Sequence, residues 1–258
     1  SIRPFIFRIA ALILCVSLGL MLFRGIAALP VPEKVIGPAG HYLARTAGET
    51  GARNVVGAIL FDYRAFDTLG ESTVIFTAVC GIAMLFSRRK FHRSSRGLSF
   101  IAKRGIGIMV PFLLMYASVI ILFGHLSPGG GFQGGTIFAT VTVLLCVVFG
   151  SSVESQYFPP RTKDILESGG ALLFSGIGLI GLAAGTGFLS NIAAGFPAGT
   201  FGSFLSAGSV PILNVAVGMK VGAGLSTIFY SMLKMLDAEN DHIEGGRPRL
   251  YCCVTPPR

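Results

Sequence analysis

The sequence predicts an all-α integral membrane protein with six membrane-spanning helices. The chain has 258 residues, of which 52% are hydrophobic and 13% charged, whereas an ordinary soluble domain carries about 25% charged residues. Its 35 glycines are nearly twice the usual share, and its mean hydropathy is +0.71. An apolar excess of this size has no place in a water-soluble core, so the surrounding solvent must be lipid. These observations exclude a soluble enzyme and a disordered tail.

Six apolar runs account for the hydrophobic excess, and each is close to the roughly 20 residues that a helix needs to cross a bilayer. The first run is too long for the core of a signal peptide and lacks a small-residue cleavage site. The second is short, so we expect it to begin a residue or two before its written limit. The predicted spans are residues 5–29, 71–86, 105–123, 134–151, 168–189 and 211–236.

Basic residues set the predicted orientation, because cytoplasmic loops carry an excess of Lys and Arg. The formal charge of +9 is concentrated in one short loop, residues 87–104, which argues for a cytoplasmic loop and against nucleic-acid binding. Arg3 and Arg8 place the N-terminus on the same side. All six spans then alternate, and both termini are predicted to be cytoplasmic. The loops predicted outside are 30–70, 125–133 and 190–210, and those predicted inside are 87–104, 152–167 and the tail from 237.

Glycine also occurs inside the predicted helices, in two pairs with small-xxx-small spacing. Gly181 and Gly185 form one pair, and Gly218 and Gly222 form the other. Such faces allow helix backbones to approach closely in lipid. Packing within this chain and packing against helices of other subunits both fit the pattern.

The usual catalytic signatures are missing, including phosphate-binding loops, zinc-ligand spacings and nucleophile motifs. Cys252 and Cys253 are adjacent in a polar tail, which is not the spacing of a zinc site, and their role is open. The glycine-rich run 128–135 follows an apolar helix rather than a strand. It is either a tight turn between helices or irregular backbone that borders an ion path at the membrane edge.

Lys220 is the most distinctive single residue, since it lies about ten residues into the last span, near the middle of the bilayer. A charge at this depth costs about 3 kcal/mol on insertion scales and must face protein or water. Lysine changes its protonation state readily when buried, which suits a proton relay. A structural ion pair is the alternative. The spans predicted above offer no acidic partner, so we expect one on another subunit.

Four further residues could bind or pass cations. Glu71 opens the second predicted span, where a carboxylate either caps the helix or gathers ions at the mouth of a path. Asp62 and Asp67 precede it, and carboxylate oxygens are the ligands that hard cations require. His125 follows the third span and either shuttles protons or binds a carbonyl at the helix end.

Three strings of the sequence resemble a known family. The string of residues 124–135, GHLSPGGGFQGG, resembles the signature of the MnhB component of Mrp-type (Mnh) Na⁺/H⁺ antiporters. Residues 214–224, NVAVGMKVGAG, are similar to the last span of that component. Residues 54–71 look like the C-terminal part of the antiporter's largest component, MnhA, which is a separate small protein in membrane-bound hydrogenases and related sulfur reductases.

The resemblance implies four parts of the chain. Residues 1–86 would be a two-span segment like the end of MnhA, and 105–236 a four-span segment like MnhB. Residues 87–104 would be the basic cytoplasmic loop between them, and 237–258 a cytoplasmic tail. The long antiporter-like N-terminal portion of a full MnhA is absent from these residues, which favours the split arrangement of hydrogenase-type respiratory complexes over a stand-alone antiporter.

The resemblance also implies a function: a non-redox subunit of a complex that exchanges Na⁺ for H⁺, in a multi-pass position in a prokaryotic inner or plasma membrane. Partners would be other Mrp-type subunits, hydrogenase-like redox subunits and lipid, but no nucleic acid. We expect no bound cofactor in this chain and no enzymatic activity of the chain alone. A scaffold without ion-path residues is the alternative. The residues implied at or near the ion route are Glu71, His125, Pro128, Phe132 and Lys220.

Overall fold

The structure, a computed structural model, describes residues 2–28, 37–86 and 98–244. Within these residues every regular element is a helix and no strand is present, which confirms the predicted fold class. Six of the described helices are long and apolar enough to cross a membrane, the number that the sequence predicts. The helices are α1 (Ile2–Ala27), α2 (Pro38–Thr50), α3 (Val55–Ala58), the π-helix η1 (Ile59–Tyr63), α4 (Ala65–Phe86), α5 (Phe100–Leu122), α6 (Gly131–Phe149), α7 (Ser151–Tyr157), α8 (Pro160–Ala183), the short 3₁₀ helix η2 (Ile192–Ala194) and α9 (Val210–Glu244).

The chain divides into two compact units, Ser1–His41 and Tyr42–Arg258. The first unit is built on α1. None of the residues in its span, Arg8–Ala27, is buried. A helix that is apolar all round must be covered by lipid or by other helices. Arg24 lies in its last turn, where the long side chain can reach the polar edge of the bilayer.

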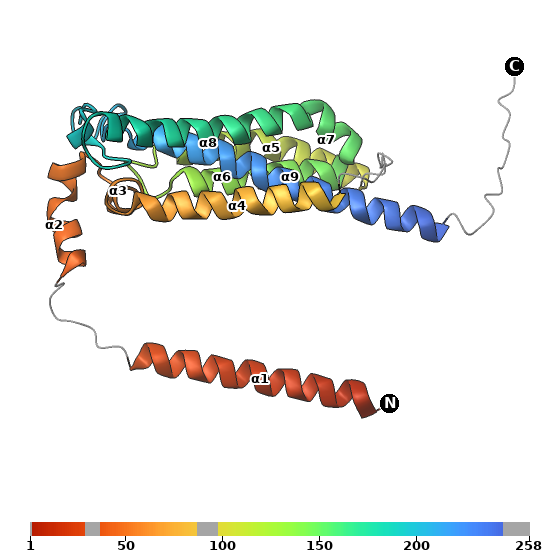
Figure 1. Ribbon diagram of the computed structural model, residues 1–258. Helices are drawn as coiled ribbons and strands as arrows, with labels where there is room; N and C mark the ends of the chain where they lie inside the picture. Colours follow the sequence, from red (N-terminus) through yellow and green to blue (C-terminus); the bar gives the residue numbers. More distant parts are fainter. Residues whose placement is uncertain (1, 29–36, 87–97, 245–258) are drawn as a thin grey trace, which may run out of the picture. The chain divides into compact units, whose positions relative to one another are not determined.

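The second unit is a bundle of long helices around α9 (Figure 1). Helices α4, α6 and α8 pack on α9, and α5 packs on α6. In the span of α9, 61% of the residues are buried, whereas in the span of α5 the share is 6%. Helix α9 is therefore the core of the bundle, and α5 presents an apolar surface to its surroundings.

Glycines set the close contact between α6 and α9. A Cβ atom on Gly131 would overlap the carbonyl oxygen of Asn214, and one on Gly135 would lie 2.8 Å from that of Gly218. A Cβ atom on Gly222 of α9 would likewise lie 3.3 Å from the carbonyl oxygen of Gly135 on α6. The Gly218 and Gly222 pair thus packs within the chain. The second pair differs, because Gly181 abuts the carbonyl oxygen of Gly187 in its own loop and Gly185 ends the helix.

Several helices begin earlier than the sequence predicts. Helix α4 starts at Ala65, so the prediction that Glu71 opens this span is wrong and Glu71 lies in the second turn. Helix α6 starts at Gly131 and takes in the second half of the glycine-rich run. In both cases polar or small residues precede the apolar run, and packing against neighbouring helices makes them helical nonetheless.

The segment 152–167 departs most from its prediction as a loop. It folds into α7 and the first two turns of α8, separated by Phe158 and Pro159, and Pro160 is the first residue of α8. Proline cannot continue the first helix but is well placed to start the second. Fixing this turn brings polar residues of the segment into the bundle.

Some predicted features lie outside the described residues, namely most of the basic loop 87–104 and the cysteines Cys252 and Cys253. The described remainder of that loop enters α5, which begins at Phe100 rather than at residue 105. At the other end, α9 continues through the first part of the predicted tail to Glu244. The side of the membrane on which each end lies stays a prediction.

Candidate functional site

The glycine-rich turn between α5 and α6 is held by two asparagines from distant parts of the chain. The Asn54 side-chain amide donates to the carbonyl oxygens of Gly124 at 2.7 Å and Ser127 at 3.0 Å, and its Oδ1 caps α3. Asn214 of α9 accepts a hydrogen bond from the backbone N–H of Gly131 at 2.8 Å. Both asparagines satisfy backbone groups that the irregular turn leaves without helical partners.

This turn closes one wall of a cavity of about 180 Å³. The opposite walls are η1, the start of α4 and α9. Glu71 and Phe132, both predicted site residues, line it together with Thr68, Gln133 and Val217. The remaining lining residues are Gly57, Leu60, Phe61, Gly129, Gly130 and Gly131. A carboxylate, an amide and a hydroxyl around a small cavity are groups that can bind water or a hard cation.

Pro128 and His125 lie near this cavity but do not line it. Pro128 is exposed and borders a second, more open hollow beside Arg53 and Asn54. His125 is fully buried, and its ring packs against Phe204 with centroids 6.5 Å apart.

The His125 ring makes no hydrogen bond of ordinary geometry with any described residue, although the backbone of Leu122, Ser203 and Phe204 surrounds it. Burial lowers the pKa of His125 below its ordinary value of 6.5, and the nearby backbone groups oppose this shift only in part. The imidazole is therefore neutral at pH 7. The His125 carbonyl accepts from the backbone N–H groups of Arg53 and Asn54 at 3.1 and 3.0 Å, which ties the turn to the segment before α3.

The three acidic residues expected to act together do not share a site. Asp67 is exposed and forms an ion pair with Arg64. Asp62 is half-buried and accepts a hydrogen bond of 3.2 Å from the Asn191 amide; its burial raises the pKa of its carboxyl above the usual 3.8. Only Glu71 faces the cavity. Among the described residues no group of three His, Cys, Asp or Glu side chains could hold a metal ion.

Lys220 lies in the middle of α9 and is 6% exposed. Its Nζ is 5.1 Å from the centroid of the Phe76 ring on α4, a cation–π contact. The carboxylate that acts on it electrostatically is Glu167 of α8, so the expectation that its acidic partner lies outside this chain is wrong. The sequence prediction missed Glu167 because it began the fifth span at 168, eight residues after the start of α8, and so left Glu167 in a loop.

A glycine explains how α8 comes so near to Lys220. A Cβ atom on Gly170 would lie 2.5 Å from the carbonyl oxygen of Ala216 and 3.0 Å from the backbone nitrogen of Lys220. The two backbones are therefore in direct contact at this depth. Glu167 is one turn earlier on α8 and is buried, and its Oε1 makes no hydrogen bond with any described residue.

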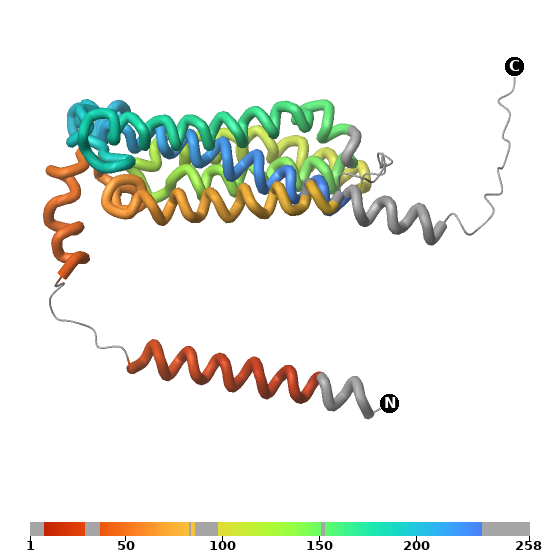
Figure 2. The backbone as a smooth tube through the Cα atoms, in the orientation of Figure 1, coloured from red at the N-terminus to blue at the C-terminus, as the bar shows by residue number. Residues whose placement is uncertain are grey.

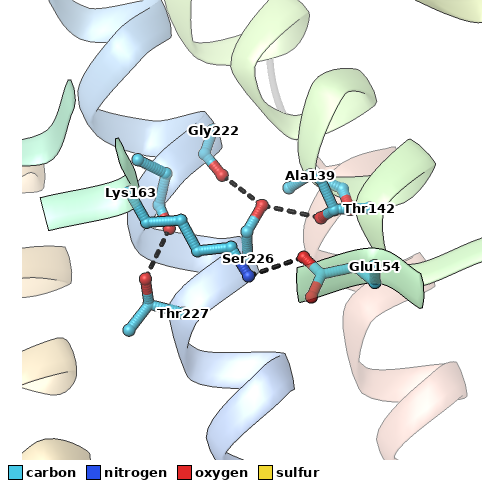
Figure 3. Close-up of polar contacts among 8 residues, drawn as sticks. Ala139, Thr142, Glu154, Lys163, Gly222, Ser226 and Thr227 are labelled. Carbon is cyan, nitrogen blue, oxygen red and sulfur yellow. Dashed lines mark hydrogen bonds and ion pairs between the residues drawn. The ribbon is translucent and has the colours of Figure 1, made fainter. Parts of the chain in front are cut away.

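A second buried pair was not predicted at all. Lys163 of α8 and Glu154 of α7 form an ion pair with an Nζ to Oε1 distance of 2.6 Å, and each side chain is 2% exposed (Figure 3). Lys163 Nζ also lies 4.4 Å from the centroid of the Tyr230 ring. The sequence feature that could have predicted this pair is the two prolines at 159 and 160, because a helix break at that point folds Lys163 back toward Glu154.

Hydroxyl groups extend this polar region toward α6. The side-chain oxygens of Thr142 and Ser226 are 2.7 Å apart, and both are buried (Figure 3). The Ser226 hydroxyl donates to the Gly222 carbonyl at 2.6 Å. The inner part of the bundle is thus polar between α6, α7, α8 and α9.

Two family models match the chain. One, described as a domain related to the MnhB subunit of Na⁺/H⁺ antiporters, matches residues 101–227. The other, MbhE, is described as the E component of MBH and matches residues 8–103. The two matches meet at the start of α5.

Two known proteins are similar to this chain in sequence. An uncharacterised protein of Methanocaldococcus jannaschii is 35% identical over 198 residues, which is 67% of this chain and 74% of the relative. A probable K⁺/H⁺ antiporter A/B component of Rhizobium meliloti is 30% identical over 166 residues, or 52% of this chain. The match covers only 16% of that longer relative.

Two solved structures share the fold. A chain of the membrane-bound sulfane sulfur reductase, an archaeal respiratory membrane complex, is 34% identical with a TM-score of 0.73, over 88% of this chain and 98% of that one. A chain of the Mrp complex from Dietzia sp. DQ12-45-1b superposes with a TM-score of 0.67 at 20% identity, over 87% of this chain and 25% of that one. The second similarity is one of fold.

Proposed function

Since the chain belongs to the family that joins an MbhE-like domain to a domain related to the MnhB antiporter protein, we propose that it provides part of the Na⁺ and H⁺ route of an ion-pumping respiratory complex. It is an antiporter-like, multi-pass membrane subunit. In the proposed complex it has no redox role and holds no cofactor. Its partners are other Mrp-type subunits and a redox module.

The observation that carries this proposal is the position of the cavity relative to Lys220. Val217 lines the cavity, and Lys220 follows it by three residues on the same side of α9. The cavity that contains Glu71 therefore borders α9 one helical turn before Lys220. A carboxylate at a small cavity near a buried lysine supports an ion route better than a scaffold, which needs neither group.

Sequence identity supports the respiratory setting over a stand-alone antiporter. The match to a chain of the sulfane sulfur reductase is 34% identical, whereas the match to a chain of the Mrp complex is 20% identical.

The test is the Glu71→Gln variant of the whole complex in liposomes. We expect proton movement driven by an imposed Na⁺ gradient to fall at least tenfold, because the amide cannot bind a cation or release a proton. Asp67→Asn, four residues earlier on α4 and away from the cavity, is the matched control and should pump normally. If Glu71→Gln assembles and pumps at the wild-type rate, the chain is a scaffold and the proposal fails.

A further inference from the structure

A row of buried charges runs along the interface of α8 and α9, away from the cavity. Lys163 and Glu167 are four residues apart and thus on one face of α8, with Cβ atoms about 5–6 Å apart. That face is turned to α9: Lys163 lies over the Tyr230 ring, and Glu167 Cδ is 3.8 Å from the position of a Cβ on Gly224. Gly170, one turn further, abuts Lys220.

The signs of these charges alternate. From the middle of the bundle toward α7 the order is Lys220, Glu167, Lys163 and Glu154, and none of the four is more than 6% exposed. Each buried charge costs several kcal/mol of desolvation before pairing repays it. A structural role requires one pair, whereas this row continues through two pairs that adjoin each other on α8.

Glu167 follows Lys163 by one turn of α8 and so lies between the two pairs. Glu154 and Lys163 are in direct contact at 2.6 Å, but Glu167 interacts with Lys220 through electrostatic attraction and leaves Oε1 without a hydrogen bond among the described residues. A buried carboxylate oxygen without a partner is costly. It is also free to accept a proton from the ammonium group of Lys163, one turn earlier on α8.

We propose that Glu154, Lys163 and Glu167 form a proton relay that connects Lys220 with the α7 end of the bundle. One proton enters at the Glu154 carboxylate. The Lys163 ammonium passes a proton to the Glu167 carboxylate and is reprotonated by Glu154. Glu167 then delivers its proton to Lys220, which has released its own toward the cavity at Glu71, so each group returns to its starting state. The inference rests on the proposed function, because it extends the same route.

The α7 end is the end at which the basic loop enters the bundle. The backbone N–H of Leu98, which follows that loop, donates to the carbonyl of Val148 at the end of α6 at 2.9 Å. The positive-inside rule predicts that this end faces the cytoplasm. The relay therefore ends toward the predicted cytoplasmic side, and the cavity lies toward the other side.

Lys163→Arg is the discriminating variant. Arginine keeps the positive charge and the pair with Glu154 but does not release a proton in proteins. We expect the complex to assemble on blue-native gels and its Na⁺-driven proton movement in liposomes to fall at least tenfold. A structural ion pair would tolerate the change, so an assembled complex that pumps at the wild-type rate overturns the relay.

A second variant and a measurement on the native complex guard against failure to fold. Glu154→Gln combined with Lys163→Met removes both charges, which usually leaves stability unchanged or improved; proton movement should again be lost. In the native complex, dicyclohexylcarbodiimide should modify Glu167 or Glu154, detected by mass spectrometry, in proportion to the loss of pumping. Pumping at the full rate after modification of either residue contradicts the relay.

The variants distinguish a failure of the relay from a failure of the proposed function. Arg161→Gln, which removes an exposed charge from the first turn of α8, is the control and should pump normally. If Lys220→Ala abolishes pumping but Lys163→Arg does not, the relay alone is wrong. If Lys220→Ala also pumps normally, the proposed function fails as well.

Discussion

Lys220 shows at the residue scale how a charge is accommodated within a membrane-spanning bundle. Its ammonium lies over the face of Phe76 and within the field of Glu167, and its side chain is almost fully buried. Each contact offsets part of the cost of removing the charge from water. Both contacts come from helices of this chain, α4 and α8.

The interaction between Lys220 and Glu167 can be measured by a double-mutant cycle. Glu167→Gln should lower the melting temperature of the purified complex, because it leaves the Lys220 charge without its counter-charge. Adding Lys220→Met should recover much of this loss, with a coupling free energy of about 0.5–3 kcal/mol. Strictly additive effects of the two substitutions would show that the two side chains do not interact.

The buried position of His125 leads us to expect that the stability of the protein depends on pH. Its folded-state pKa lies below the unfolded value of 6.5, so the unfolded chain binds a proton more readily. Stability is therefore fully retained above pH 6.5 and is lost as the pH falls below it. Melting curves of the complex between pH 7.5 and 5.5 should show this loss, and His125→Gln should reduce it. An equal loss in the variant would assign the effect to other groups.

At the scale of elements, the contact between α6 and α9 depends on residues without side chains. Gly131 and Gly135 let the backbones touch, and the Gly131 N–H binds the Asn214 side chain at the same point. Lipid gives helices no hydrophobic drive to associate, so close packing and such hydrogen bonds must supply the attraction. The turn that closes the cavity is fixed by this contact.

Gly131→Ala tests this packing. The added Cβ would overlap the Asn214 carbonyl, so α6 must move and the complex should assemble poorly on blue-native gels. Gly176→Ala in α8 is the matched control, since nothing lies within 4 Å of its Cβ position, and it should assemble normally. Normal assembly of both variants would show that α6 and α9 can separate without consequence.

For the whole molecule, the surface indicates an assembly. Within the second unit, α5 buries only 6% of the residues in its span. Glu71 is exposed on α4 within a span, where a carboxylate is costly against lipid. A neighbouring protein over Glu71 would complete the wall of the cavity. Figure 2 shows the second unit with the loops after α8 gathered at the same end as α3, where Asn191 binds Asp62.

The sequence was sufficient to predict the six spans and the prominence of Lys220, because hydropathy and the scarcity of charge report them directly. It placed Glu71 and Phe132 in one site only through resemblance. It missed Glu167, Lys163 and Glu154, because polar residues ahead of an apolar run read as a loop. Their burial depends on the turn at Pro159 and Pro160 and on contacts with α9, which are tertiary facts.

The most direct test of the central claim is ion movement by the purified complex carrying Lys220→Ala. The complex is reconstituted in liposomes, a Na⁺ gradient is imposed, and proton movement is followed with a pH-sensitive dye, while blue-native gels report assembly. The account predicts an assembled complex whose Na⁺-driven proton movement is reduced to background. Wild-type proton movement in the assembled variant would contradict it.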